Sequence, residues 1–481
     1  MKELAERVLN AAQLSGAIYA DVRLIQEHRQ FFSVKNGLVE APHDEEKQGF
    51  GVRVLLDGAW GFASSSNLEL KTAEQVTGLA LRIARASAGV KNRDVSLGQP
   101  EVHTARYETP LEVDPFSVSE QEKISFLLSA DTEMQRVKGI RSTRSTMEFI
   151  QEDKLFASSE GSWIEQRIIE SGAGIEATAV GNNDAQSRSF PNNLERQQGT
   201  GGYELISRLE LSANAGRIAE EAVALLSAAS CPRKTTTIIL DATILSLQLH
   251  ESCGHATELD RVLGDEASYA GTSFLTLEKM GVYRYGSPLV NIYLDSTMPG
   301  ALGTFGFDDE GVPAQRSPLI LEGIHVGYHT SRETAAILEQ RSNGCMRADG
   351  WNRTPIIRMT NIILQPGTWE LDNLIADTDD GIYMLVNKSW SIDNQRLNFQ
   401  FGAQVGYEIT GGKLGRLIKN PTYTGVTPQF WGACDAICNE NHFRIYGLPF
   451  CGKGEPWQGA PIGHGAAPAR FRNVQVGAGG A

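Results

Sequence analysis

The apolar positions of the first ninety residues switch between helical and strand spacing. Apolar residues three and four positions apart predict two amphipathic helices, one beginning near residue 4 and one covering residues 71–88. Between them, strand patterns cover residues 19–27, 31–35, 48–56 and 59–64. The last two strands are joined by Asp57-Gly58, a pair that suits the positive φ angles of a tight turn, and therefore predict a hairpin.

The pattern then changes around residues 89–115, which are polar and interrupted by proline, and we place the first domain boundary there. Beyond it, Ser119 and Glu122 have the spacing of a capping box that opens a helix. Strand-like alternation from residue 139 to about 176 and a helix over 203–227 follow. The sequence thus predicts an N-terminal α+β subdomain (1–110), a central α+β subdomain (111–232) and a C-terminal domain (233–481).

The C-terminal domain is predicted to be largely β, with one apolar helix near its start. A strand over residues 236–240 leads into this helix, and most of residues 288–473 read as strands and hairpins with glycine turns. The fold class expected for the whole chain is α+β. Its N-terminal region would be of α/β type, with mixed sheets and long helices.

Composition narrows the function classes. A chain of 481 residues exceeds what one hydrophobic core usually serves, so two or three domains are expected. The net charge of −14 argues against nucleic-acid binding as the main function. The sequence contains no run of 18 apolar residues, so no membrane-spanning helix is predicted. Six cysteines without framework spacing and no recognisable signal peptide predict reduced thiols and a cytoplasmic location.

The candidate chemistry lies in the apolar helix, where His250 and Glu251 are followed by His255. Neutral imidazoles bind Zn²⁺, and a glutamate beside a ligand is well placed to take a proton from water and pass it to a leaving amine. An ideal helix, however, turns ~100° per residue, so positions i and i+5 lie ~140° apart. Both histidines can bind one metal only if a π-bulge, or an irregular exit at Gly254, brings them together. The alternative is a pair of structural histidines with satisfied hydrogen bonds.

Several nearby residues could support such a site. Glu258 and Asp260 could orient an imidazole from behind, or could cap the helix end as solvated charges. Cys253 is expected to be a small buried apolar residue, with ligation of the metal as the alternative. The Cys434 and Cys438 pair is expected to pack in a helix, because no second pair accompanies it.

Two further polar segments are expected to lie outside the chemistry. His464 falls in a glycine-rich stretch and is predicted to be a loop residue, with contact to a substrate as the alternative. Asp308-Asp309-Glu310, between glycines, is predicted to form a turn whose carboxylates bind backbone amides or arginines, although a second metal cluster is the alternative.

A third metal ligand is available in Cys451, which is predicted to lie in a glycine-punctuated loop 196 residues beyond His255. With this cysteine included, the sequence resembles the TldD/PmbA family of peptidases over nearly its whole length. The segments that carry the resemblance are residues 51–55, 57–62, 250–255, 306–313, 358–361 and 451–463. The resemblance is to the active TldD branch, and it implies that His250, His255 and Cys451 bind zinc while Glu251 acts as the general base.

The resemblance also implies how the protein works as an assembly. It predicts a zinc-dependent peptidase that hydrolyses unfolded or extended peptides inside a dimer cavity, either to process precursors or to degrade small unstable proteins. The dimer would be a homodimer or a heterodimer with a PmbA/TldE-like paralogue, with no nucleic acid or membrane partner. The alternative is a non-catalytic PmbA/TldE-like subunit that binds peptides. A purely structural zinc site would want four protein ligands, and the sequence offers three.

Overall fold

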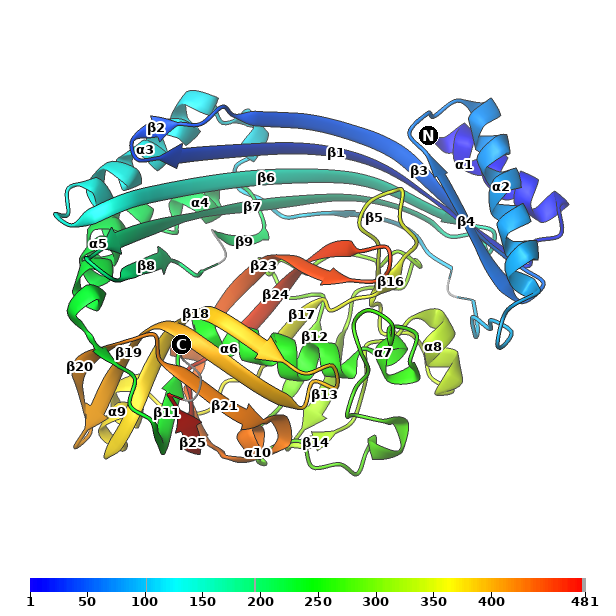
Figure 1. The fold of residues 1–481 in the computed structure, drawn as a ribbon. Coiled ribbons are helices and arrows are strands. Elements are labelled where there is room, and N and C mark those ends of the chain that lie inside the picture. The colour runs from blue at the N-terminus through cyan, green and yellow to red at the C-terminus, as the bar shows by residue number, and fades with distance from the viewer. Residues whose placement is uncertain (101, 194–195, 478–481) are drawn as a thin grey trace.

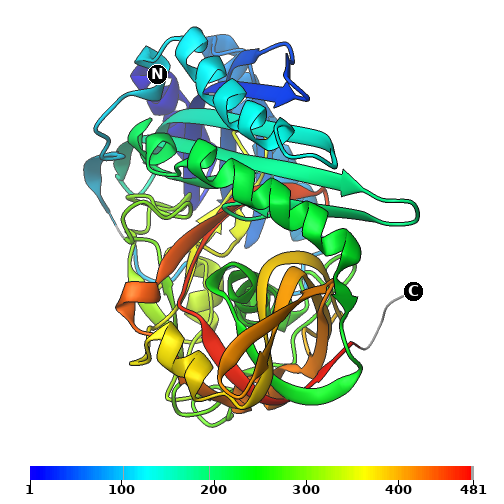
Figure 2. The same cartoon turned by 90° about the vertical axis from the view of Figure 1, so that its left-hand side faces the viewer.

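The computed structural model describes residues 1–100, 102–193 and 196–477, and it confirms the α+β class. A long curved sheet forms one layer, and two further sheets form the body beneath its concave face (Figure 1). Figure 2 shows the same two layers from the side. No helix in the described ranges is long and apolar enough to cross a membrane.

The curved layer is a nine-stranded sheet with the main order β4-β3-β1-β6-β7-β5, in which β2, β8 and β9 pair beside this path. Its strands are β1 (Tyr19–Lys35), β2 (Leu38–Val39), β3 (His43–Leu56), β4 (Ala59–Ser65), β5 (Thr104–Glu108), β6 (Ile140–Ser158), β7 (Trp163–Val180), β8 (Ala185–Phe190) and β9 (Gln197–Thr200). Strands from both of the first two predicted subdomains therefore share one sheet, and the division at residue 110 stays a prediction.

Helices cover the two ends of this sheet and create a separate apolar core at each end (Figure 1). One end is covered by α1 (Lys2–Leu14) and α2 (Leu70–Ala88), and the other by α3 (Glu120–Gln135), α4 (Glu204–Ser207) and α5 (Leu211–Ser227), with the short helix η1 (Pro115–Ser117) before α3. The middle of the concave face is left to face the C-terminal body.

In this layer, the predictions that depend only on residues close together in sequence, a turn and a helix cap, are confirmed. Asp57 and Gly58 join β3 to β4 with φ angles of 53° and 73°. Ser119 caps α3 by accepting a hydrogen bond from the Glu122 amide. Two boundaries were wrong. Residues 28–30 continue β1 because they pair with β3 on one side and β6 on the other. The helix predicted over 203–227 is interrupted because Glu210 adopts a left-handed conformation, with φ of 50°.

The body contains an eight-stranded sheet, a six-stranded sheet and a two-stranded ribbon. The eight-stranded sheet comprises β10 (Ala229–Ser230), β11 (Lys234–Leu240), β18 (Asp380–Ile392), β19 (Asn398–Thr410), β20 (Lys413–Lys419), β21 (Thr422–Val426), β22 (Cys434–Ile437) and β25 (Ala469–Val476). The six-stranded sheet comprises β12 (Ile292–Asp295), β13 (Arg316–Leu321), β14 (Ile324–His325), β17 (Asn361–Leu364), β23 (Arg444–Lys453) and β24 (Gln458–Ala466), and the ribbon comprises β15 (Met346–Arg347) and β16 (Ile356–Ile357).

Helix α6 (Ala242–Leu249) packs against strands of both large sheets, within one continuous apolar core. The remaining helices are short: η2 (His250–Gly254), η3 (His255–Thr257), α7 (Leu259–Leu263), η4 (Leu277–Lys279), α8 (Arg332–Ile337), α9 (Leu371–Ala376), α10 (Thr427–Gly432) and η5 (Glu440–His442). The predicted apolar helix is thus held between two sheets, beneath the curved layer (Figure 1).

Candidate metal centre

The helix that carries the two histidines changes its winding at the first of them. Asp241 caps α6 by accepting a hydrogen bond from the Thr243 amide, and the chain then forms a π-helical turn, η2, followed by the 3₁₀ turn η3. The predicted π-bulge is therefore confirmed. Because the wider turn absorbs one extra residue, the His250 and His255 rings lie side by side, edge to face, with centroids 4.8 Å apart.

Gly254 permits this turn to pack closely against Met359, which lies between β16 and β17. A Cβ atom at position 254 would lie 2.1 Å from the Met359 sulfur, so any larger residue would push the helix away from its neighbour. The glycine between the two histidines is therefore required by packing, since its φ of −52° is one that any residue can adopt.

Cys451 reaches the histidines from a strand, β23, and the prediction that it lies in a loop was wrong. The glycines around it do not end the strand, although its pairing with β24 is irregular between Leu448 and Cys451. Its Sγ lies 3.3 Å from His250 Nε2 and 3.4 Å from His255 Nε2. The three atoms lie within 4.8 Å of one another, and all three side chains are buried. Two nitrogens and a sulfur thus converge on one small space, an arrangement that suits a metal ion.

The pKa values of the three side chains also suit metal binding. Burial lowers the pKa of His250 to about 4, and burial also lowers the pKa of His255, so the neutral form of each ring, which has one free lone pair, is favoured. Burial alone would raise the pKa of the Cys451 thiol, but the neighbouring His255 and Arg358 bring that pKa below its ordinary value. A neutral imidazole and a readily ionised thiol are the forms that bind metals.

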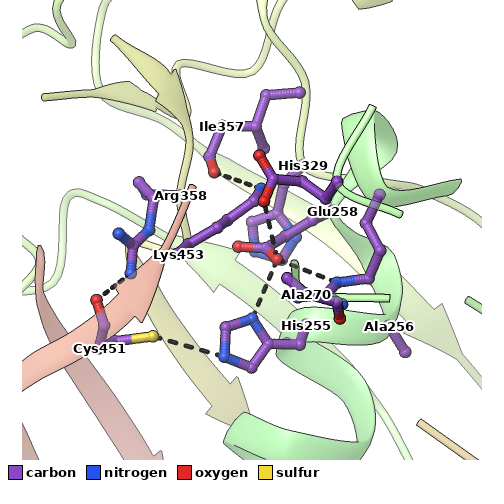
Figure 3. A network of polar contacts seen from close by, with 12 residues as sticks. His255, Ala256, Glu258, Ala270, His329, Ile357, Arg358, Cys451 and Lys453 are labelled. Atoms are coloured by element: carbon purple, nitrogen blue, oxygen red, sulfur yellow. Dashed lines mark hydrogen bonds and ion pairs between the residues drawn. The ribbon is translucent and has the colours of Figure 1, made fainter. Parts of the chain in front are cut away.

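Each imidazole is fixed from behind through its Nδ1 atom. His255 Nδ1 lies 2.9 Å from Glu258 Oε2 (Figure 3), and His250 Nδ1 lies 2.8 Å from His464 Nε2. Since Nδ1 is occupied in both rings, both Nε2 atoms are directed toward Cys451. Glu258 thus occupies the orienting position predicted for it.

Asp260 has a different partner. Its carboxylate oxygens lie 2.7 and 2.8 Å from Lys453 Nζ, and the lysine also donates to the Ile357 carbonyl oxygen. Lys453 is fully buried and lies 3.4 Å from Glu258 Oε2 (Figure 3). Asp260 is therefore neither a solvated cap nor a partner of an imidazole, and it instead holds the lysine that faces Glu258.

Glu251 lies beside the cluster and not within it. With His250, His255 and Cys451 it lines a cavity of about 450 Å³. Its carboxylate is bound by Arg396, whose guanidinium nitrogen lies 2.5 Å from Oε2. Arg396 was not predicted, because it is 145 residues further along the chain and no local motif marks it.

The prediction that His464 is a loop residue was wrong. It lies on β24 and is buried, and its neighbours pair in parallel with β17. The glycine beside it serves close packing and not turn formation, because a Cβ atom at Gly463 would lie 2.0 Å from Asn361 Oδ1.

The remaining cysteines lie outside the cluster. Cys253 is fully buried in the apolar core, and burial raises the pKa of its thiol to about 12. The expectation that Cys434 and Cys438 pack in a helix was wrong: α10 ends at Gly432, and Cys434 begins β22, which pairs with β25. Both side chains are nevertheless buried, as expected.

The acidic segment at residues 308–310 forms the predicted turn. Asp308 accepts hydrogen bonds from the amides of Glu310, Val312 and Met346. Asp309 pairs with Lys154, and Glu310 pairs with Arg53. These contacts join the C-terminal body to the curved sheet, so the segment is structural.

Comparison with known proteins places this architecture in a family. Models of the PmbA/TldA metallopeptidase match in three parts: domain 1 at residues 20–88, the central domain at 113–229 and the C-terminal domain at 233–478. A metalloprotease of Methanocaldococcus jannaschii is 29% identical over 94% of this chain and 95% of its own. A protein of Saccharolobus solfataricus named a zinc metalloprotease TldD homolog is 26% identical over 50% of this chain and 51% of its own.

Two solved structures share the fold. A candidate modulator of a DNA gyrase from Thermotoga maritima superposes with a TM-score of 0.79 and 19% identity, over 99% of both chains. TldE from Thermococcus kodakarensis superposes with a TM-score of 0.74 and 16% identity, again over 99% of both chains. The matching models span nearly the whole chain, and the chain therefore belongs to the TldD/PmbA family of metallopeptidases.

Proposed function

We propose that this protein is a zinc-dependent peptidase in which His250, His255 and Cys451 hold the ion and Glu251 is the general base. The observation that carries the proposal is the convergence of two Nε2 atoms and one Sγ in a buried site, with the opposite nitrogen of each ring already bound. Two neutral imidazoles and one thiolate are a donor set that zinc prefers, and three protein ligands leave a position open.

The zinc ion, when bound, supplies a Lewis acid that lowers the pKa of a water molecule and polarises a carbonyl group. The protein supplies the proton transfers. Glu251, in the cavity wall beside both histidines, accepts the proton of the attacking water and returns it to the leaving amine. The zinc in the name of the Saccharolobus relative supports the choice of metal.

The second candidate function is a non-catalytic subunit that binds peptides, as in the PmbA/TldE-like branch. TldE from Thermococcus kodakarensis has the same fold, which keeps this alternative open. The complete set of two histidines, one cysteine and an adjacent glutamate favours the peptidase, because a binding subunit has no need of a general base beside a metal site.

The substrates are proposed to be unfolded or extended peptides, cleaved in the cavity of a dimer in the cytoplasm. The partner would be a second copy of the chain or a PmbA/TldE-like paralogue. A second cavity, of about 350 Å³, lies between the curved sheet and the β23–β24 hairpin, and Phe450 lines both this cavity and the one beside Glu251. This proximity supports the proposal that an extended peptide binds across both.

The test uses one substrate in two states. A stably folded small domain and a destabilised variant of it are incubated with the zinc-loaded protein, and fragments are followed by mass spectrometry. We expect internal cleavage of the variant alone, because a folded domain presents no free strand that can enter an enclosed site. A chelator should stop the cleavage, and added zinc should restore it.

Two results would contradict the proposal in different ways. Cleavage inside the stable domain at the rate of the variant would indicate an open cleft. Cleavage that a chelator does not slow would exclude a metallopeptidase, and the absence of any cleavage by the homodimer or by the dimer with a paralogue would favour the binding subunit.

The carboxylate behind His255 gives a separate prediction. Glu258→Gln should weaken zinc binding by roughly 10- to 100-fold, because an imidazole that loses its carboxylate partner is a poorer and less fixed ligand. Competition with a chromophoric chelator measures this change. Asp265→Asn, which alters an exposed carboxylate nearby, is the matched control and should bind zinc normally. Equal affinities in the two variants would mean that Glu258 does not support the site.

A further inference from the structure

Arg396 is held in an unusual backbone conformation at the edge of the catalytic cavity. It lies in the turn between β18 and β19 with a φ of 64°, the left-handed region that non-glycine residues seldom adopt. Such strain persists where the surrounding structure enforces it, and it is found most often at functional sites.

The turn that carries Arg396 is fixed from three sides. Asp393 accepts hydrogen bonds from the amides of Gln395, Leu397 and Asn398. The segment at residues 272–274 donates two backbone hydrogen bonds to the turn, and the Thr427 hydroxyl donates to the Arg396 carbonyl oxygen. The position of the guanidinium is therefore determined by a rigid scaffold.

The guanidinium faces the reaction space. Arg396 lines the cavity of about 450 Å³ together with Glu251, His250, His255 and Cys451. Among the described residues that line this cavity it is the one arginine or lysine. One of its nitrogens binds Glu251, while its Nε is buried and has no hydrogen-bond partner in the described part of the chain. A buried donor without a partner has a strong tendency to bind any acceptor that enters.

We propose that Arg396 is a second catalytic residue, which donates hydrogen bonds to the carbonyl oxygen of the scissile peptide bond as that oxygen becomes negatively charged. This inference rests on the proposed peptidase function. Preorganised donors aimed at a developing oxyanion are among the strongest contributions to catalysis, and a guanidinium in the wall of this cavity offers charge and direction together.

The charges balance within this arrangement. The water oxygen bonds to the carbonyl carbon, the π electron pair of the carbonyl moves onto its oxygen, and the water proton passes to the Glu251 carboxylate. Glu251 thereby loses its negative charge at the step in which the substrate oxygen gains one. The guanidinium thus exchanges one anionic partner for another, and the net charge of the group is unchanged. When the C–N bond breaks, the proton moves to the leaving nitrogen and the original ion pair forms again.

The test measures binding of a phosphinic peptide, a stable tetrahedral anion that resembles the oxyanion. Its affinity is determined by calorimetry for four zinc-loaded proteins: the wild type, Arg396→Gln, Glu251→Gln and the double variant. We expect Arg396→Gln to weaken binding by about 10²-fold whether residue 251 is Glu or Gln, because the arginine contacts the ligand directly. In turnover, Arg396→Gln should lower kcat by about 10² to 10³ with a much smaller change in KM.

A merely structural role for Arg396 predicts a different pattern. If the arginine only positions Glu251, its removal should cost nothing further once residue 251 is Gln, and this result would overturn the inference. So would unchanged affinity of Arg396→Gln, or a wild-type protein that does not bind the anion. Arg396→Lys, which keeps the charge but not the planar fork, should retain part of the affinity.

Folding and the proposed function are controlled separately. Arg416→Gln removes an exposed arginine paired with Glu408 and should bind the phosphinic peptide as the wild type does. Thermal unfolding shows whether Arg396→Gln is folded. If wild-type protein cleaves peptides and Glu251→Gln does not, the peptidase function stands whatever Arg396 does.

Discussion

Glu251→Gln is expected to keep its zinc and to lose peptidase activity by roughly 10²-fold or more. Glutamine has the shape of glutamate and still forms hydrogen bonds, but it cannot accept a proton from the attacking water. Glu251 lines the cavity beside His250 and His255 without belonging to the group of converging ligand atoms, so removing its charge should leave the metal in place. Steady-state cleavage of an unfolded peptide and elemental analysis of the same sample measure the two properties.

A control variant shows whether a loss of activity comes from the missing proton acceptor or from a change in the protein as a whole. Glu440→Gln, which changes an exposed carboxylate in the C-terminal body, should match the wild type in both measurements. Cleavage by Glu251→Gln at the wild-type rate would show that this glutamate is not the base, and the histidine pair would then mark a binding site alone. Loss of zinc together with activity would show that the residue acts on the metal instead.

The part of this site that could be predicted from the sequence is the part set by local geometry. Two histidines five positions apart cannot share a face of a regular helix, so the sequence required an extra residue in the turn, and the π-helical turn at His250–Gly254 provides it. The hairpin at Asp57-Gly58 is predictable for a similar reason, because the two residues themselves determine the turn.

The partners that hold the site in place could not be predicted in this way. His464 and Arg396 approach the helix only because β24 and the β18–β19 turn are packed beside it, and neither contact leaves a pattern in the nearby sequence. The glycine next to His464 was misleading, since glycine marks both turns and close approaches of backbone, and here it accommodates Asn361. Lys453 carries no local mark of its burial, although its position between Asp260 and Glu258 requires an ion-pair network.

We expect the wild-type protein to bind about one zinc ion per chain, and Cys451→Ser and His255→Ala each to lose most of that binding. A site with three protein ligands binds far more weakly when one is removed, because water is a poor substitute for a thiolate or an imidazole. Serine in place of Cys451 has nearly the same size, but its hydroxyl does not ionise near neutral pH. Peptidase activity should fall with the zinc content, and elemental analysis after dialysis against a weak chelator measures that content.

Cys253→Ala provides the matched control for the cysteine. Cys253 lies in the same turn as both histidines, yet it packs in the apolar core and its thiol is outside the converging group. This variant should therefore retain zinc, even if the small cavity it creates lowers the stability of the fold by about 1 kcal/mol. Undiminished zinc in Cys451→Ser would remove Cys451 from the ligand set. Loss of zinc in Cys253→Ala alone would identify the helix cysteine as the third ligand. Loss in Cys451→Ser and His255→Ala, with zinc retained in Cys253→Ala, is the pattern that a site built from η2, η3 and β23 requires.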